Sequence, residues 1–157
     1  MPIDRHLVEA AAVLHDLDKA LPSADPLRAL GHGYAGAQWL IDHGFPELAA
    51  PVAQHPVSRL GLDAAYAAFL EAATWEVRVV AYADKRAAQR LQPMGMRFRR
   101  WKRRHPELGS SLKSSRKRAG LLEAEICAAA GITPEQVRRL RWVAVATARA
   151  RKARKAA

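Results

Sequence analysis

The stretch Leu7-Val8-Glu9-Ala10-Ala11-Ala12-Val13-Leu14-His15-Asp16 decides the fold of this chain. An apolar, alanine-rich run of this kind predicts a helix, and here it ends in an imidazole beside a carboxylate. Because polar groups at the edge of a core need partners, the doublet indicates a function. More imidazoles and carboxylates follow in order along the chain: Asp18, His32, His55 and Asp84. This ordered series predicts a metal site.

The helical pattern continues along nearly the whole chain of 157 residues. Alanine is abundant and alternating β-branched residues are almost absent, which predicts an all-α fold, a helical bundle. The length predicts one domain, or one domain with an extension. The expected helices cover residues 5–20, 33–43, 46–55, 63–72, 74–91, 96–104 and 113–130, and a last one begins at the capping box Thr133-Pro134-Glu135-Gln136. We expect Trp142 of this last helix in the core.

Several classes of protein are excluded by the sequence. No stretch approaches about 18 uncharged apolar residues, so we predict no membrane span and no membrane partner. The N-terminus has no basic region followed by an apolar core and a cleavage site, so we expect no signal peptide. The single cysteine, Cys127, rules out an internal disulfide framework and is typical of a reducing cytoplasm.

The net charge of +11 is distributed unevenly along the chain. Residues 1–92 have a net charge of −3, whereas residues 93–157 have a net charge of +14. We therefore expect a metal-binding helical domain over 1–92 and a basic helical extension over 93–157 that packs on the same domain. A basic surface attracts phosphate-bearing partners such as nucleotides, nucleic acid or anionic lipid. Scattered charges that only keep the protein in solution are the alternative.

Two of the expected helices each direct a polar side chain toward the core. In the helix over 74–91, Asp84 occupies a position of a buried face whose other members are apolar. In the helix over 5–20, His15 lies on the apolar stripe in the same way. A buried carboxylate needs a cation or hydrogen-bond donors, and metal sites inside helical bundles are built from such inward side chains. Core histidines with satisfied hydrogen bonds and helix-capping carboxylates are the alternative.

The ligand chemistry of this series suits hard or borderline divalent ions. Imidazole and carboxylate groups bind manganese, iron(II), cobalt, nickel, zinc or magnesium. A single cysteine cannot form the thiolate cluster that holds structural zinc. We therefore expect one or two divalent metal ions per chain.

Four segments in this order resemble the HD-domain metal-dependent phosphohydrolases. They are Ala11-Ala12-Val13-Leu14-His15-Asp16-Leu17-Asp18-Lys19, His32-Gly33-Tyr34-Ala35-Gly36-Ala37, His55 and Ala81-Tyr82-Ala83-Asp84-Lys85. The doublet alone is a weak match, whereas the full ordered set is strong and covers about residues 3–90. The chain is similar to the bacterial branch that has extra histidines between the doublet and the final aspartate.

The resemblance implies a role for each matching residue. His15, Asp16 and Asp84 would hold a first metal ion. His32 and His55 would hold a second, with Asp16 bridging the two ions. Lys19 would neutralise a substrate phosphate; a cation favoured by the helix dipole is the alternative.

Two neighbouring residues have two interpretations each. Arg86, two residues after Asp84, would bind a substrate phosphate or form a surface salt bridge. Asp18 would orient a ligand histidine through a hydrogen bond, or only end the helix.

One feature departs from the family pattern. The family has an earlier histidine, on a helix before the doublet, that completes the first metal site. Only 14 residues precede His15 here, and His6 lies in the same expected helix, too close to fill that place. We therefore expect the first helix and its histidine to be missing, and an apolar surface beside residues 5–20 that a partner subunit of a homo-oligomer would cover.

Residues 97–104 form a strongly basic segment, because six of the eight side chains are Arg or Lys. We expect Arg97 and Arg100 to bind substrate phosphate at the mouth of the active site. Phe98 and Trp101 are three residues apart and share one helical face, so we expect them to dock this helix on the core. A nucleic-acid surface on which the two rings stack against bases is the alternative.

Together these features predict a metal-dependent phosphohydrolase that acts on a phosphorylated small molecule, with a nucleotide as the expected substrate, through a metal-activated water. Asp16 and Lys19 are the expected catalytic residues, and Asp16 or Asp84 would assist the water as a base. The rival interpretation is a non-catalytic HD-like protein that binds nucleic acid or a regulatory nucleotide through its basic C-terminal half.

Overall fold

The computed structural model describes residues 2–87, 91–137, 139–140, 145, 148 and 151–154. Every named element in these residues is helical, which confirms the expected all-α fold. None of the described helices combines the length and apolar character that crossing a bilayer requires. Trp142, expected in the core, lies outside the described residues.

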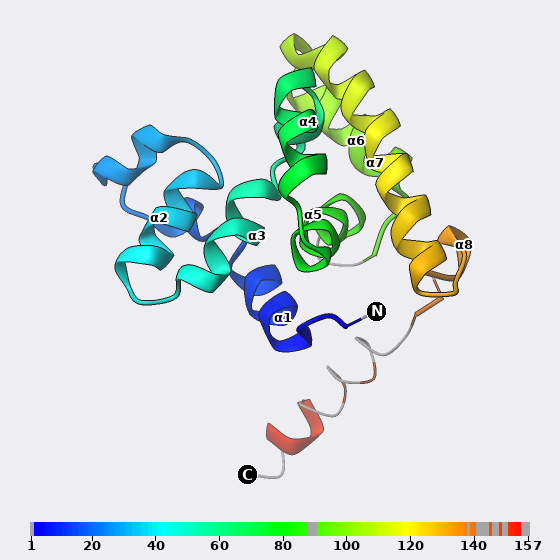
Figure 1. Cartoon of the computed structure of the whole chain (residues 1–157), viewed down its shortest axis with the longest axis horizontal. Coiled ribbons are helices and arrows are strands. Elements are labelled where there is room, and N and C mark those ends of the chain that lie inside the picture. The colour runs from blue at the N-terminus through cyan, green and yellow to red at the C-terminus, as the bar shows by residue number, and fades with distance from the viewer. Residues whose placement is uncertain are drawn as a thin grey trace.

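The described chain forms a series of α-helices joined by short 3-10 turns. The α-helices are α1 (Arg5–Leu14), α2 (Tyr34–Asp42), α3 (Ala49–Gln54), α4 (Asp63–Ala72), α5 (Trp75–Arg86), α6 (Met94–Arg104), α7 (Gly109–Ala129) and α8 (Pro134–Val137). The 3-10 turns are η1 (Leu17–Ala20), η2 (Pro26–Leu30), η3 (Pro46–Leu48), η4 (Val57–Leu60) and η5 (Pro106–Leu108). In Figure 1, α1, α2 and α3 lie to one side of α5, and α4, α6 and α7 lie to the other.

Helix α5 packs against both of these groups. Its Val80 belongs to an apolar cluster whose buried members from the other elements are Ala11, Ala37, Leu40, Leu48, Val52 and Ala53. Its Val77, Ala81 and Tyr82 belong to a second cluster whose other buried members are Leu60, Phe69, Met94, Phe98, Leu112, Ala119 and Leu122. The basic helices α6 and α7 therefore share a hydrophobic core with α5.

The first helix is shorter than expected, because it ends where the His-Asp doublet begins. It starts after Asp4, whose carboxylate caps the helix by accepting a hydrogen bond from the N–H of Leu7. His15 still has helical dihedral angles, but Asp16 (φ −99°, ψ 19°) does not, and the chain continues as η1. The doublet thus occupies a helix end, where its side chains are free to turn toward neighbouring elements.

Two of the predicted helix caps form as expected, whereas two other boundaries differ from the prediction. Thr74 caps α5, and the capping box between Thr133 and Gln136 forms in both directions. Helix α5 ends at Arg86 and not at residue 91, whereas α7 begins at Gly109, ahead of the expected residue 113. The glycine and serines at 109–111 favour a loop, but the turn η5 leads into them and Leu112 packs in the core. Tertiary packing here outweighs local propensity.

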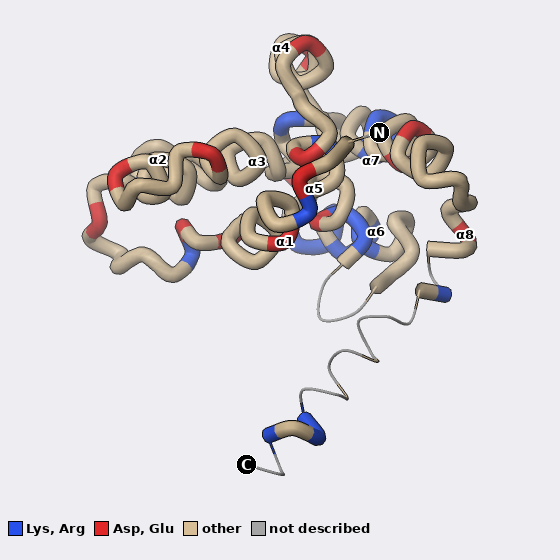
Figure 2. The backbone as a smooth tube through the Cα atoms, turned by 60° about the horizontal axis from the view of Figure 1, so that its bottom comes forward, with Lys and Arg blue, Asp and Glu red and all other residues tan. Residues whose placement is uncertain are grey.

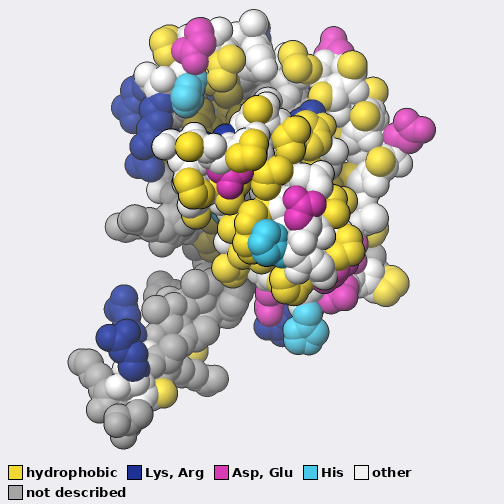
Figure 3. Space-filling view, turned by 90° about the vertical axis from the view of Figure 1, so that its left-hand side faces the viewer, with side chains coloured by type: hydrophobic (Ala, Val, Ile, Leu, Met, Phe, Trp, Pro, Cys, Tyr) yellow, Lys and Arg dark blue, Asp and Glu magenta, His cyan; other side chains and the backbone are white. Residues whose placement is uncertain are grey.

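Apolar side chains remain exposed beside the N-terminal helices. Val13 on α1 is 82% exposed, and side chains of η2, α2 and the following turn are exposed as well: Leu30, Tyr34, Ile41 and Phe45. Figure 3 shows hydrophobic side chains gathered on the side of the molecule where α2 lies. The expectation that a partner subunit covers such a surface stays a prediction.

Replacing Phe98 with alanine tests whether the basic helix α6 is part of the core. Phe98 is 4% exposed and lies in the cluster that α5 shares with α7. We expect Phe98→Ala to lower the free energy of unfolding by about 3–5 kcal/mol, because it removes a buried ring and leaves a cavity. Met96 is two residues away and 44% exposed, so Met96→Ala is the matched control, with a loss below about 1 kcal/mol. Equal losses in denaturant unfolding would contradict this packing.

Candidate metal centre

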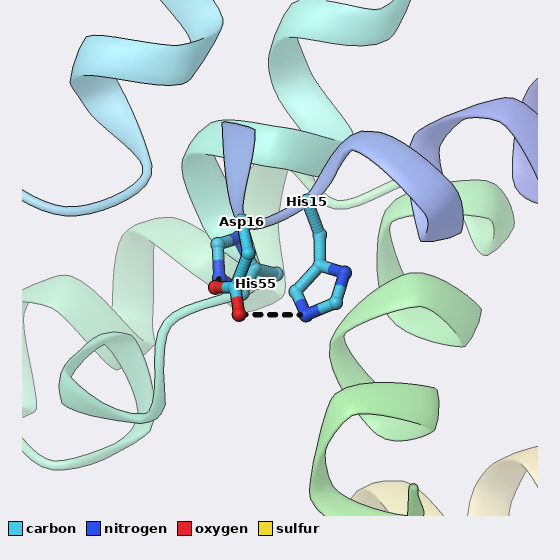
Figure 4. Close-up of side chains that lie close together, drawn as sticks. All are labelled: His15, Asp16 and His55. Carbon is cyan, nitrogen blue, oxygen red and sulfur yellow. Dashed lines mark ion pairs between the residues drawn. The ribbon is translucent and has the colours of Figure 1, made fainter. Parts of the chain in front are cut away.

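Three histidines from separate parts of the chain surround the Asp16 carboxylate. The distance from His15 Nε2 to Asp16 Oδ2 is 3.6 Å, and the distances from His32 Nε2 and His55 Nε2 to Asp16 Oδ1 are 3.6 Å and 3.7 Å. His15 and Asp16 come from the end of α1 and His55 from the end of α3, and their side chains point toward one another (Figure 4). His32 comes from the turn before α2. The structure therefore brings together four of the five predicted metal ligands around one carboxylate.

The second ring nitrogen of each histidine is bound to an acceptor. Nδ1 donates a hydrogen bond in each case: from His15 to the Ala12 carbonyl (2.8 Å), from His55 to the Val52 carbonyl (2.6 Å) and from His32 to the Asp18 carboxylate (2.9 Å). A neutral imidazole that donates from Nδ1 has a lone pair on Nε2. In the neutral ring, all three Nδ1 contacts leave Nε2, on the side of Asp16, as the nitrogen that can bind a metal, and Asp18 has the orienting contact that the sequence suggested.

Three observations indicate that this donor set fits a cation. His32 Nε2 and His55 Nε2 are only 3.2 Å apart, close enough for both nitrogens to bind one cation or for one ring to donate a hydrogen bond to the other. Asp18 Oδ1 is buried and has no hydrogen-bond partner among the described residues. One ligand atom each from His15, Asp16 and His55 lie within 4.8 Å of one another, as do those from Asp16, Asp18 and His32. Imidazole nitrogen and carboxylate oxygen suit a borderline divalent ion.

Asp84, the fifth predicted ligand, lies at the edge of this cluster. Its Oδ1 is 3.9 Å from His15 Nε2. Both of its carboxylate oxygens already have cationic partners, since Lys85 Nζ is 3.2 Å from Oδ2 and Arg97 Nη2 is 3.2 Å from Oδ1. Asp84 thus faces the imidazole of His15 from α5 while two positive side chains hold its carboxylate in place.

Lys85 is a site residue that the sequence analysis did not assign. It is completely buried, and its ammonium group donates hydrogen bonds to the His55 carbonyl and to the Asp84 carboxylate. Lys85 thereby links the backbone at His55 to Asp84. The sequence does indicate that Lys85 is buried, because Val77, Ala81 and Lys85 are spaced four residues apart along the buried face of α5.

The surroundings shift the pKa values of several of these groups. Partial burial would raise the pKa of Asp16, but interactions with His55 and Lys19 outweigh it and hold that pKa well below its ordinary value. Burial lowers the pKa of His55 and so favours the neutral, metal-binding imidazole.

The pKa values of Asp84 and Lys85 are both lowered. Burial would raise the pKa of Asp84, but the charge of Lys85 outweighs it, so this carboxylate is ionised at neutral pH. Complete burial lowers the pKa of Lys85, and the charge of Asp84 opposes that shift.

A cavity of about 350 Å³ opens beside the cluster and is lined by His15, Asp16, Asp84 and Arg97, among others. Arg97 reaches it from α6 and donates from Nη2 to the Asp84 carbonyl at 2.9 Å. Lys19, also predicted to bind phosphate, is 61% exposed, and its Nζ is 2.7 Å from Asp16 Oδ1. Two of the predicted phosphate-binding cations thus lie beside the carboxylates of the cluster.

The two other predicted phosphate-binding arginines do not line this cavity, as far as the described residues define it. Arg86 is 4% exposed and forms an ion pair with Glu123 of α7, with 2.7 Å between Nη1 and Oε1. Side chains two residues apart on a helix point about 200° away from each other, so Arg86 faces away from Asp84. The prediction for Arg86 is therefore corrected to a buried ion pair between α5 and α7. Arg100 lies one turn beyond Arg97 on α6, outside the lining.

Comparison with known proteins identifies the class. A family model for the HD domain matches residues 1–89, which is more than half of the 157 residues. The chain therefore belongs to the HD-domain family. HD domains are in general metal-dependent phosphohydrolases, and they bind divalent metals. No curated protein and no solved structure matched the chain in the same comparisons.

Gly33 allows the segments that carry His32 and His55 to lie in contact. It has a φ of +84°, and a Cβ placed on it would lie 2.8 Å from Pro56 Cγ and 3.1 Å from the Ala53 carbonyl oxygen. Any larger residue would therefore press against the chain on both sides of His55. Gly31 also has a positive φ, +82°, but a Cβ there would meet nothing within 4 Å.

We expect Gly33→Ala to lower both stability and metal content, and Gly31→Ala to lower stability only. Both changes introduce backbone strain of about 1–3 kcal/mol, but only the methyl at position 33 separates the two histidine segments. Thermal unfolding and the amount of manganese bound per chain measure the two effects. If Gly31→Ala lost as much manganese as Gly33→Ala, backbone strain alone would explain the result and the contact would be irrelevant.

Proposed function

We propose that this protein is a metal-dependent phosphohydrolase that acts on a phosphorylated small molecule, with a nucleotide as the expected substrate. One observation carries the proposal: three imidazole Nε2 atoms, each with Nδ1 bound elsewhere, face a single ionised carboxylate, that of Asp16. The cavity beside this carboxylate has room for a small substrate. The single, buried Cys127 supports a reducing, cytoplasmic location.

His15, Asp16, His32 and His55 would hold one or two divalent ions, with Asp84 completing the set from α5. The Asp16 carboxylate lies within 4 Å of all three Nε2 atoms, which suits a bridging carboxylate. When bound, such an ion supplies Lewis-acid chemistry toward a phosphoryl group and its attacking water. Asp18 would keep His32 in its metal-binding tautomer through the Nδ1 hydrogen bond.

The remaining polar groups would orient the reactants. Arg97 presents a planar guanidinium at the cavity wall and would bind two phosphate oxygens in a forked geometry. Lys19 would pass from Asp16 to the substrate phosphate, since its exposed side chain has freedom to move. Asp84, ionised beside Lys85, would accept a hydrogen bond from the attacking water and so direct it at phosphorus.

Removing the His55 imidazole tests the metal centre. We expect purified His55→Ala to bind less manganese than the unchanged protein, and to release less phosphate from a panel of nucleotides. His43→Ala is the matched control, because His43 also follows a helix and donates from Nδ1 to a backbone carbonyl, yet it is exposed and stacks on Trp39. The His43→Ala variant should bind as much manganese and release as much phosphate as the unchanged protein. Full metal loading without turnover of any nucleotide would favour the rival, non-catalytic interpretation.

Replacing Arg97 tests phosphate recognition. We expect Arg97→Met to lower kcat/KM by about 10- to 100-fold, the equivalent of one charge-assisted hydrogen bond to the substrate. Arg5→Met removes the same charge from an exposed position on α1 and should leave kcat/KM unchanged. Manganese content is measured in parallel. A fall in manganese that matches the fall in activity would show that Arg97 acts by positioning Asp84 instead.

A further inference from the structure

The helical hairpin formed by α6 and α7 has a surplus of positive charge that the metal centre does not use. Between residues 94 and 118 there are ten basic side chains, and Glu107 is the only acidic one. Figure 2 shows Lys and Arg gathered on α6 and on α7. Only two of the ten have acidic partners among the described residues, because Arg97 pairs with Asp84 and Arg118 pairs with Asp63.

Four of the unpaired cations surround a groove between the two helices. The groove has a volume of about 230 Å³, and Phe98 and Leu112 contribute its apolar lining. The cationic side chains that line it are Arg99 and Lys102 from α6 and Lys113 and Arg116 from α7, all exposed. No carboxylate among the described residues lines this groove.

Two of these guanidinium groups converge over Gly95. A Cβ placed on Gly95 would lie 3.5 Å from Arg116 Nη2 and 3.8 Å from Arg99 Nη1. The two guanidinium groups lie near the same point and carry the same charge, so they repel each other. An anion between them would offset that repulsion. Arginine in particular binds phosphate oxygens through its planar, forked donors.

The dimensions of the hairpin favour a polyanion over a single small anion. The groove cations of α6, Arg99 and Lys102, span about one turn, but Arg103 and Arg104 are exposed as well and extend the positive charge to the end of this helix of 11 residues, about 16 Å long. Phosphates along one nucleic-acid strand are spaced about 3.4 Å apart along the duplex axis, so several of them fit this length.

The aromatic side chains of α6 pack against other groups of the protein. Phe98 is 4% exposed, and Trp101 packs edge-on against it with 5.0 Å between the ring centroids. The guanidinium of Arg97 covers the Trp101 ring at 4.6 Å. Any nucleic acid bound here would therefore be held through its phosphates, without base stacking and without sequence preference.

We propose that the groove between α6 and α7 binds the phosphodiester backbone of a nucleic acid. The cations that form it are different from the residues that line the cavity at the metal centre. Binding is therefore independent of the proposed hydrolase activity, and it occurs with or without turnover of a small substrate.

The test is binding of the full chain to a fluorescein-labelled duplex of about 20 base pairs, measured by anisotropy over a range of salt concentrations. The slope of log K against log salt is negative, and the loss of each phosphate contact reduces its magnitude by about 0.9. We expect Arg99→Gln/Arg116→Gln to reduce the magnitude of the slope by about 1.8. The affinity at 0.1 M salt should fall on the order of 10- to 100-fold. The double variant Arg151→Gln/Lys152→Gln removes the same charge from the exposed C-terminal segment and should change both values much less.

Three outcomes would overturn the proposal. Equal losses in the two double variants would show that net charge, and not the groove, attracts the duplex. Displacement of the duplex by inorganic triphosphate at an equal concentration of phosphate groups would identify a small anion as the ligand. Tighter binding to phosphatidylserine vesicles than to the duplex, abolished in Arg99→Gln/Arg116→Gln, would identify a lipid surface. His55→Ala should bind the duplex normally. The binding experiment therefore tests the groove even if the proposed metal centre is wrong.

Discussion

The whole site depends on a constraint at the ends of two helices. The last carbonyls of an α-helix have no partner within the helix. At the ends of α1 and α3, a histidine uses Nδ1 to bind the carbonyl three residues earlier, Ala12 for His15 and Val52 for His55. The hydrogen bond completes the helix and at the same time leaves the Nε2 lone pair facing outward. The helix ends thus select the tautomer of the neutral ring that metal binding needs.

What distinguishes these two histidines from others on the chain is where their helices end. His43 forms the same kind of hydrogen bond at the end of α2, but it faces solvent and stacks on Trp39. Helices α1 and α3 both pack on α5, and Lys85 of α5 binds the carbonyl of His55. Convergence on Asp16 therefore comes from packing, whereas the orientation of each ring comes from its own helix.

The sequence contains most of the candidate site and less of its geometry. The order of His15, Asp16, His32, His55 and Asp84 was enough to predict a cluster, because each residue interrupts an apolar pattern or follows a helix. The ring tautomers depend on local hydrogen bonds that no spacing reveals. For Arg86, proximity to Asp84 in the sequence favours a phosphate, whereas the direction of the helix face agrees with the alternative of a salt bridge, which is buried. The end of α1 was missed because no glycine or proline marks it.

Helix α6 contributes side chains to both of the proposed anion-binding regions. Arg97 faces Asp84 and the cavity, whereas Arg99, two residues later, points about 200° away and lines the groove toward α7. Arg97 is balanced by a carboxylate and belongs to the metal centre, while Arg99 has no acidic partner among the described residues and belongs to the exposed surface. The family match ends at residue 89, so both regions draw on helices beyond it. Because the two arginines lie on different faces of one helix, substitution can test the two proposed roles separately.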